Sequence, residues 1–105
     1  MDIIIQSLGF TAGEKLEAHV KEKLEKLILQ DRIVRAHVTL FFGPDRSVRT
    51  ATCEIRLEMP GNDPFVKESS YEFEQSIDAA VDTLQAILRK AKEKLEDQRH
   101  HGISN

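Results

Sequence analysis

The sequence predicts an α+β fold, a two-layer sandwich of βαβββα order in which two helices pack on one face of a four-stranded mixed sheet. Two stretches repeat apolar residues at helical spacing, and four stretches are apolar or alternate apolar and polar residues as strands do. The chain has 105 residues, which is enough for one core, and it shows no internal repeat or linker. We therefore expect one domain over residues 1–98 and a flexible tail over residues 99–105.

The chain is expected to begin with a strand and a helix. Residues 1–8, "MDIIIQSL", are β-branched and apolar, as in a strand. Thr11 and Glu14 have the spacing of a capping box, which predicts a helix start there. This helix is expected to end near Leu29, and its apolar face consists of Leu16, Val20, Leu24 and Leu27.

Three more strands are expected between the two helices. Residues 33–42 and 49–59 alternate, and residues 65–70 form a shorter, weaker pattern after the loop "PGNDP". The first two strands flank a helix and should be parallel through a right-handed crossover, whereas the turn-linked pairs should be antiparallel. The alternation predicts these inward residues: Val34, Ala36, Val38, Leu40, Phe42, Ala51, Cys53, Ile55, Leu57 and Met59.

The last helix is expected to be longer than the sheet that it covers. Ser69 and Glu72 form a second candidate capping box, and the helix should run from Phe73 to about Asp97. Such a helix is roughly 37 Å long, whereas a ten-residue strand is about 33 Å long. The final turns can therefore project past the sheet. The apolar stripe of this helix is Phe73, Ile77, Val81, Leu84, Leu88, Ala91 and Leu95.

Charge is unevenly distributed in this mildly acidic chain, whose formal net charge is −3. The first half of the last helix carries only acidic residues, and the second half carries Arg89, Lys90, Lys92 and Lys94. The helix dipole favours this arrangement at both ends, so the pattern alone is compatible with simple helix stabilisation or with a polyanion site. The first helix favours the second reading, because Lys15, His19, Lys23 and Lys26 fall on one flank of its apolar stripe.

Residue types and their spacing argue against catalysis and membrane insertion. No glycine-rich phosphate loop or zinc-ligand spacing is present, and Cys53 lies among core positions, so we expect no enzyme, cofactor or metal. No apolar run is long enough to span a membrane and no signal peptide is evident, which predicts a cytoplasmic protein. Aromatic residues are few, with one tyrosine and no tryptophan, and the phenylalanines are predicted to lie mainly in the core. A nucleic-acid partner would therefore be folded RNA, contacted through its phosphates and shape.

The sequences of both predicted helices resemble those of a known protein family. "FTAGEKLEAHVKEKLEKL" and "SIDAAVDTLQAILRKAKEKL" resemble the two helices of the ribosome hibernation-promoting factors, also called ribosome-associated inhibitors or sigma-factor modulation proteins. The resemblance covers residues 1–96 and keeps the βαβββα order. It departs at Thr83 and Ala86, where the family often has basic residues, and at one extra residue in "TAGEKL". The matching positions are Phe10, Thr11, Leu16, Val20, Lys23, Lys26, Leu27, Ile77, Asp78, Leu84, Leu88, Lys90, Lys92, Lys94 and Leu95.

The resemblance implies a translation inhibitor that binds ribosomal RNA of the small ribosomal subunit and occupies the mRNA and tRNA channel of idle ribosomes. By matching position it assigns RNA contact to Lys23, Lys26, Lys90, Lys92 and Lys94, and Arg89 is added on charge and location. The chain resembles the short members, which lack a second domain, and both promotion and prevention of ribosome pairing stay open. It is expected to be monomeric, with no membrane or small-molecule partner.

One alternative from another class is a protein-interaction module or homodimer, formed through an exposed sheet edge, with no RNA partner. The two hypotheses differ in their salt dependence, because lysine–phosphate contacts release counterions and weaken steeply as salt rises. Apolar or sheet-edge association should weaken far less.

Overall fold

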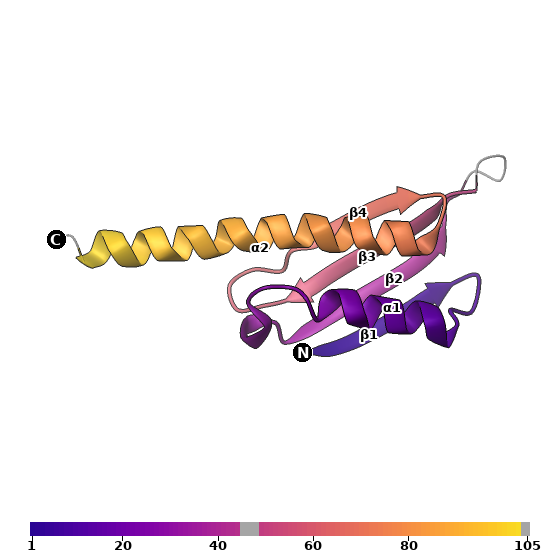
Figure 1. The fold of residues 1–105 in the computed structure, drawn as a ribbon, viewed down its shortest axis with the longest axis horizontal. Coiled ribbons are helices and arrows are strands. Elements are labelled where there is room, and N and C mark those ends of the chain that lie inside the picture. Colours follow the sequence, from indigo (N-terminus) through magenta and orange to yellow (C-terminus); the bar gives the residue numbers. More distant parts are fainter. Residues whose placement is uncertain (45–48, 104–105) are drawn as a thin grey trace.

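The computed structural model confirms the α+β class and the βαβββα order (Figure 1). It describes the backbone of residues 1–44 and 49–103 and the side chains of residues 1–44 and 49–96. The elements are β1 (Asp2–Leu8), α1 (Glu14–Leu24), the short 3-10 helix η1 (Gln30–Arg32), β2 (Arg35–Phe42), β3 (Ala51–Glu58), β4 (Phe65–Ser70) and α2 (Phe73–Ile103).

The sheet has the predicted mixed topology, with strand order β1-β2-β3-β4. β1 and β2 are parallel, because α1 forms the crossover between them, and the two following pairs are antiparallel. One row of aligned residues crosses all four strands, from Ile4 through His37 and Arg56 to Phe65. This row lies on the face of the sheet that points away from the core.

Both helices cover the other face of the sheet, where the core lies (Figure 1). The largest fully buried side chains come from both helices and from β2 and β3, and they include Val20, Leu24, Val38, Leu40, Ile55, Leu57, Ile77, Leu84 and Leu88. Val34 is an exception to the predicted inward set. It precedes β2 and its side chain is 56% exposed, so the expectation for this residue was wrong.

α1 is shorter than predicted at its C-terminal end. It ends at Leu24 instead of near Leu29, because the side-chain amide of Gln30 donates hydrogen bonds to the carbonyl oxygens of Leu24, at 2.7 Å, and Leu27, at 2.9 Å. Leu29 adopts a left-handed conformation with φ of 60°, which ends the helical path and leads into η1. The predicted capping box at Thr11 is also absent, because the helix is preceded by Gly13 with no side-chain cap.

α2 begins at Phe73, as predicted, but its predicted cap is absent and its C-terminal end lies later than predicted. β4 extends to Ser70, so Ser69 belongs to the strand, where its hydroxyl bonds that of Thr52 at 2.8 Å and does not cap the helix. At the other end, α2 continues to Ile103, beyond the expected end near Asp97. Residues 104–105 of the expected tail lie outside the described residues, and the flexibility of the tail stays a prediction.

Candidate nucleic-acid interface

The C-terminal half of α2 projects beyond the sheet, as the sequence predicted (Figure 1). A helix of 31 residues is about 46 Å long, whereas the eight residues of β3 span about 27 Å. Among the described side chains of α2, Leu88 is the last that is fully buried, and Leu95, two turns later, is 39% exposed. The cations from Arg89 onward therefore lie on the part of the helix that leaves the core.

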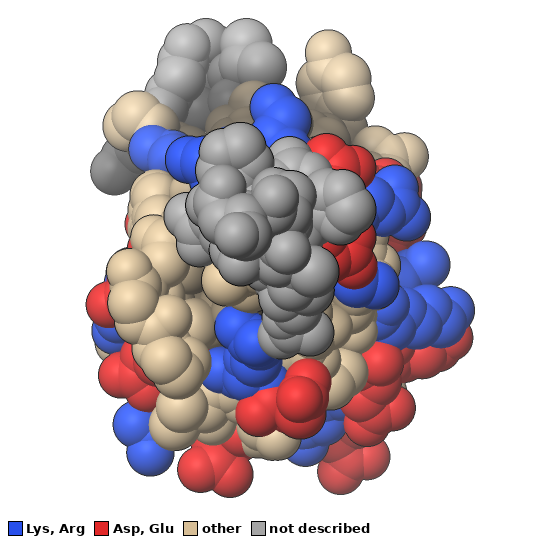
Figure 2. Space-filling view, turned by 90° about the vertical axis from the view of Figure 1, so that its left-hand side faces the viewer, with Lys and Arg blue, Asp and Glu red and all other residues tan. Residues whose placement is uncertain are grey.

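The four α2 cations point to different sides of this projecting helix. At about 100° per residue, Lys90 and Lys94 share one flank, and Lys92 lies on nearly the opposite flank. Figure 2 looks onto this end of the molecule and shows basic side chains on either side of the helix end, with acidic ones interspersed. None of the four, including Arg89, forms an ion pair with a carboxylate among the described residues.

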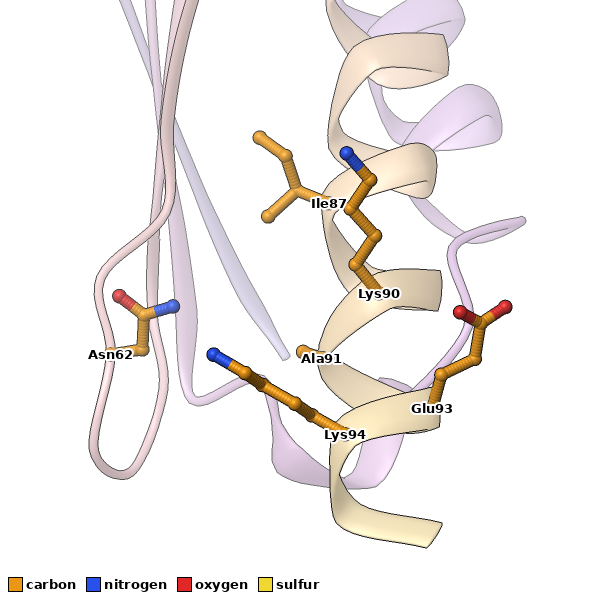
Figure 3. Close-up of a pocket in the computed structure, with 6 residues that line it drawn as sticks. All are labelled: Asn62, Ile87, Lys90, Ala91, Glu93 and Lys94. Carbon is orange, nitrogen blue, oxygen red and sulfur yellow. The ribbon is translucent and has the colours of Figure 1, made fainter. Parts of the chain in front are cut away.

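An open cleft of about 440 Å³ lies along the flank of Lys90 and Lys94. Ile87 and Ala91 of α2 line it, and Asn62 lines it from the loop between β3 and β4. In Figure 3, the side chain of Lys94 extends from α2 toward Asn62 across this cleft. The helix end and the loop therefore present cationic and amide groups to the same space.

A smaller cleft of about 150 Å³ lies on the flank of Lys92. Arg32, exposed at the end of η1, lines it together with Lys92 and Glu96, and Leu29 and Leu95 supply its apolar wall. Sequence reasoning missed both Arg32 and Asn62 as site residues. Each lies in a connecting segment far from α2 in the chain, so only the fold shows that it is next to the basic end.

The basic flank of α1 faces α2, and Asp78 of α2 lies against it. Asp78 Oδ1 is 2.7 Å from Nε2 of His19 and 3.8 Å from Nζ of Lys23. The basic residues on this flank of α1 therefore lie next to a carboxylate of α2, a neighbour that the sequence of α1 alone does not reveal. Asp78 therefore joins the two helices.

Lys23 and Lys26 differ from the α2 cations because each has a nearby carboxylate. The side chain of Lys23 is 32% exposed beside Asp78. Lys26 lies just past the end of α1, with its Nζ 3.8 Å from Oε1 of Glu22 and its side chain 64% exposed. Their charges are therefore partly neutralised, whereas those at the end of α2 have no comparable partner among the described side chains.

Gln85 of α2 fixes the position of the connection between α1 and η1. Its Oε1 accepts a hydrogen bond from the backbone N–H of Ile28 at 2.9 Å, and its Nε2 donates to the carbonyl oxygen of Lys26 at 3.0 Å. This pair of bonds holds Lys26, and through the following residues Arg32, next to α2. A glutamine in an exposed helical pattern gave no sequence signal of this role.

Metal-ligating side chains are dispersed among the described residues, and the single cysteine is buried. The described residues include no group of three or more His, Cys, Asp or Glu residues that could hold a metal ion. Cys53 is fully buried, as predicted, and burial followed by the charge of Glu54 raises the pKa of its thiol to about 12. Within the described part of the chain, no helix is both long enough and apolar enough to cross a membrane.

The comparisons agree with this fold. The sequence model of the family described as Sigma 54 modulation protein / S30EA ribosomal protein matches residues 3–96. A ribosomal subunit interface protein from Coxiella burnetii has a similar structure, with 18% identity and a TM-score of 0.80, over 89% of this chain and 99% of that one. The N-terminal domain of Protein Y from Thermus thermophilus has 26% identity and a TM-score of 0.74, over 86% of this chain and 98% of that one. No curated protein matches the sequence closely.

Proposed function

The chain belongs to the Sigma 54 modulation protein / S30EA ribosomal protein family, and from this premise we propose that it is a hibernation factor that binds the small ribosomal subunit and inhibits translation. It occupies the mRNA and tRNA channel through basic residues of both helices. The protein works in the cytoplasm as a monomer on idle ribosomes, as in a stress response.

One observation carries this proposal: four cations project past the core on α2, and none is paired with a carboxylate among the described side chains. The helix dipole explains why cations are favourable near a helix C-terminus. It does not explain why the helix that carries them extends beyond the sheet. Phosphate oxygens of ribosomal RNA are suitable partners, because they are anionic and closely spaced. Arg89, Lys90, Lys92 and Lys94 make these contacts.

Lys23 and Lys26, at the end of α1, and Arg32 extend the proposed RNA-binding surface beyond the α2 cations. Lys23 and Lys26 lie beside α2, and Arg32 lines the same cleft as Lys92. Inhibition requires occupancy alone, without covalent chemistry, cofactor or metal. The affinity is therefore set by phosphate contacts and falls steeply as salt increases.

The experiment is co-sedimentation of the purified protein with small ribosomal subunits at near-physiological salt. The test variant carries Lys90→Glu, Lys92→Glu and Lys94→Glu. The control carries the same change in charge at exposed cations elsewhere, Lys21→Glu, Arg49→Glu and Lys67→Glu, and circular dichroism checks the folding of both.

We expect the native protein and the control variant to sediment with subunits and the test variant to stay in solution. Equal binding of all three proteins would show that the RNA-binding face lies elsewhere. Failure of the native protein to bind would reject the proposed function.

The alternative function is a protein-interaction module or homodimer with no RNA partner. The observation that favours it is the uncovered face of the sheet, where Ile4 is 47% exposed and Phe65 is 53% exposed. Sedimentation equilibrium across a range of salt concentrations distinguishes the two functions. A dimer that persists at high salt, in a protein that does not bind subunits, would favour the alternative.

A further inference from the structure

We infer that the cleft between the β3–β4 loop and α2 is a pocket for one unpaired nucleotide of RNA, with its phosphate on Lys90 and Lys94 and its base edge on Asn62. This inference rests on the proposed function and makes it more specific. Phosphate contacts alone hold any RNA of suitable shape, whereas contact with a base edge selects the sequence or structure at one position.

The dimensions and the lining of the cleft suit a nucleotide. Its volume of about 440 Å³ lies in the usual range for small-molecule sites, roughly 300–1,000 Å³. Ile87 and Ala91 provide an apolar surface on which the face of a base can lie. Lys90 and Lys94 stand one helical turn apart on the same flank. Figure 3 shows Lys94 directed to Asn62 and Lys90 directed along α2 toward Ile87, so a shared phosphate requires Lys90 to turn into the cleft.

The charge of the cleft also suits a phosphate. Among the residues whose side chains the structure describes, Glu93 is the one carboxylate that lines it, and Figure 3 shows its side chain directed to the other side of α2, away from Asn62. On the side that faces Asn62, the described charged groups of the lining are therefore the two lysines. Neither lysine forms an ion pair with a described carboxylate that a ligand would have to displace.

Asn62 lies opposite the lysines, in a tight turn. Its backbone forms an isolated β-bridge with Met59, closed by an N–H to carbonyl bond of 3.4 Å. Gly61 has φ of 81°, a left-handed conformation that glycine adopts readily, and this allows the tight turn between them. The turn places the exposed side chain of Asn62 at the mouth of the cleft.

The amide of Asn62 has the chemistry of a base-reading group. It offers both a donor and an acceptor, and none of its side-chain atoms bonds another described residue. In double-stranded RNA the major-groove edges of the bases lie in a deep, narrow groove that side chains cannot reach. Unpaired bases expose their hydrogen-bonding edges to a side-chain amide. The occupant is therefore an unpaired nucleotide in a loop or bulge.

The test variant is Asn62→Ala, which removes the amide and keeps every cation. The matched control is Gln6→Ala, which removes an exposed amide from the opposite face of the sheet. Affinity for small ribosomal subunits is measured at several salt concentrations, together with the melting temperature of each protein. Base-specific chemical probes for all four bases then map the subunit RNA at saturating protein.

We expect Asn62→Ala to weaken binding about 5- to 100-fold, the range for loss of a good base contact, with an unchanged slope of affinity against salt. Gln6→Ala should leave affinity unchanged. The native protein should protect one or a few unpaired bases from modification, and Asn62→Ala should restore the reactivity of one of them.

Each other outcome overturns the inference. If the Lys90→Glu, Lys92→Glu, Lys94→Glu variant loses binding but Asn62→Ala binds like the native protein, the proposed function stands and the nucleotide pocket is rejected. A reduced salt slope in Asn62→Ala, or an unchanged protection pattern, also rejects base contact. If the native protein fails to bind subunits, the proposed function and the pocket fail together.

Discussion

His19 and Asp78 join the two helices, since Nε2 of His19 and Oδ1 of Asp78 lie 2.7 Å apart. The same carboxylate oxygen is 3.8 Å from Nζ of Lys23, one of the proposed RNA contacts. Asp78 therefore has two effects, because it stabilises the helix pair and also neutralises part of a charge that the RNA would use.

Asp78→Asn should separate these effects. We expect the variant to lose up to about 1 kcal/mol in the free energy of unfolding, because the pair is partly exposed. Its affinity for small ribosomal subunits at low salt should rise about twofold or more, because Lys23 no longer has a competing anion. Chemical denaturation and subunit binding measure the two quantities, and Asp82→Asn, an exposed change in the same half-helix, is the control. Equal affinity in both variants would argue that Lys23 does not contact RNA.

Arg32→Ala should reduce the dependence of binding on salt. If Arg32 contacts a phosphate together with Lys92, its loss should lower the slope of log affinity against log salt by about 0.7–0.9. Titrations of subunits at four or more salt concentrations give the slope. Arg56→Ala, on the uncovered face of the sheet, should leave the slope unchanged. The same slope in both variants would remove Arg32 from the proposed surface.

Cys53 should be unreactive in the folded protein. Burial raises the pKa of its thiol to about 12, so at pH 8 only ~10⁻⁴ of it is thiolate, against roughly a quarter for an ordinary cysteine. A thiol reagent should therefore modify the native protein at least about a thousandfold more slowly than the denatured protein. Rapid modification under native conditions would indicate that the core opens frequently around β3.

Glu58 should make stability depend on pH in the acidic range. Partial desolvation acts to raise its pKa, but the His37 ring, whose Nε2 lies 3.4 Å from Oε1 of Glu58, and the charge and hydrogen bond of Arg35 outweigh it and hold the pKa below its ordinary value. A carboxyl group of this kind stabilises the fold above its unfolded-state pKa and loses that contribution as pH falls through its folded-state pKa.

Glu58→Gln should therefore be less stable than the native protein at pH 7. The difference should shrink as the pH falls below the unfolded-state pKa of glutamate and disappear once the pH has passed the lower, folded-state pKa of Glu58. Urea denaturation between pH 7 and pH 3 measures it. A difference that stays constant over this range would mean that the glutamine disturbs packing and that the charge of Glu58 contributes nothing.

The sheet and the apolar faces of the helices could be predicted because their signals are local. Alternation in β3 and helical spacing in α2 each arise from residues a few positions apart, and the α2 stripe matched the core from Phe73 through Leu88. The end of α1 could not be predicted in this way. Gln30 ends the helix by bonding carbonyl groups of the preceding turn, and a polar residue there is equally compatible with a longer helix.

Part of the candidate site could be predicted because its signal is also local. The basic end of α2 is a run of cations in the sequence, so the sequence alone predicts its lysines. Asp78 and His19 are 59 residues apart, and Asn62 and Lys94 come from a loop and a helix that meet only in three dimensions. Pairing and clefts of this kind depend on tertiary structure, and a single sequence contains no local pattern for them.

The projecting end of α2 links RNA binding to helix formation. Lys90 and Lys94 are one turn apart, and like charges at this spacing destabilise a helix by about 0.2–0.5 kcal/mol. Beyond Leu88 few buried side chains offset this repulsion. A bound phosphate removes it, so the complex should favour the helical state more than the free protein does. The backbone amides of these turns should therefore exchange with deuterated water more slowly on the ribosome than in solution.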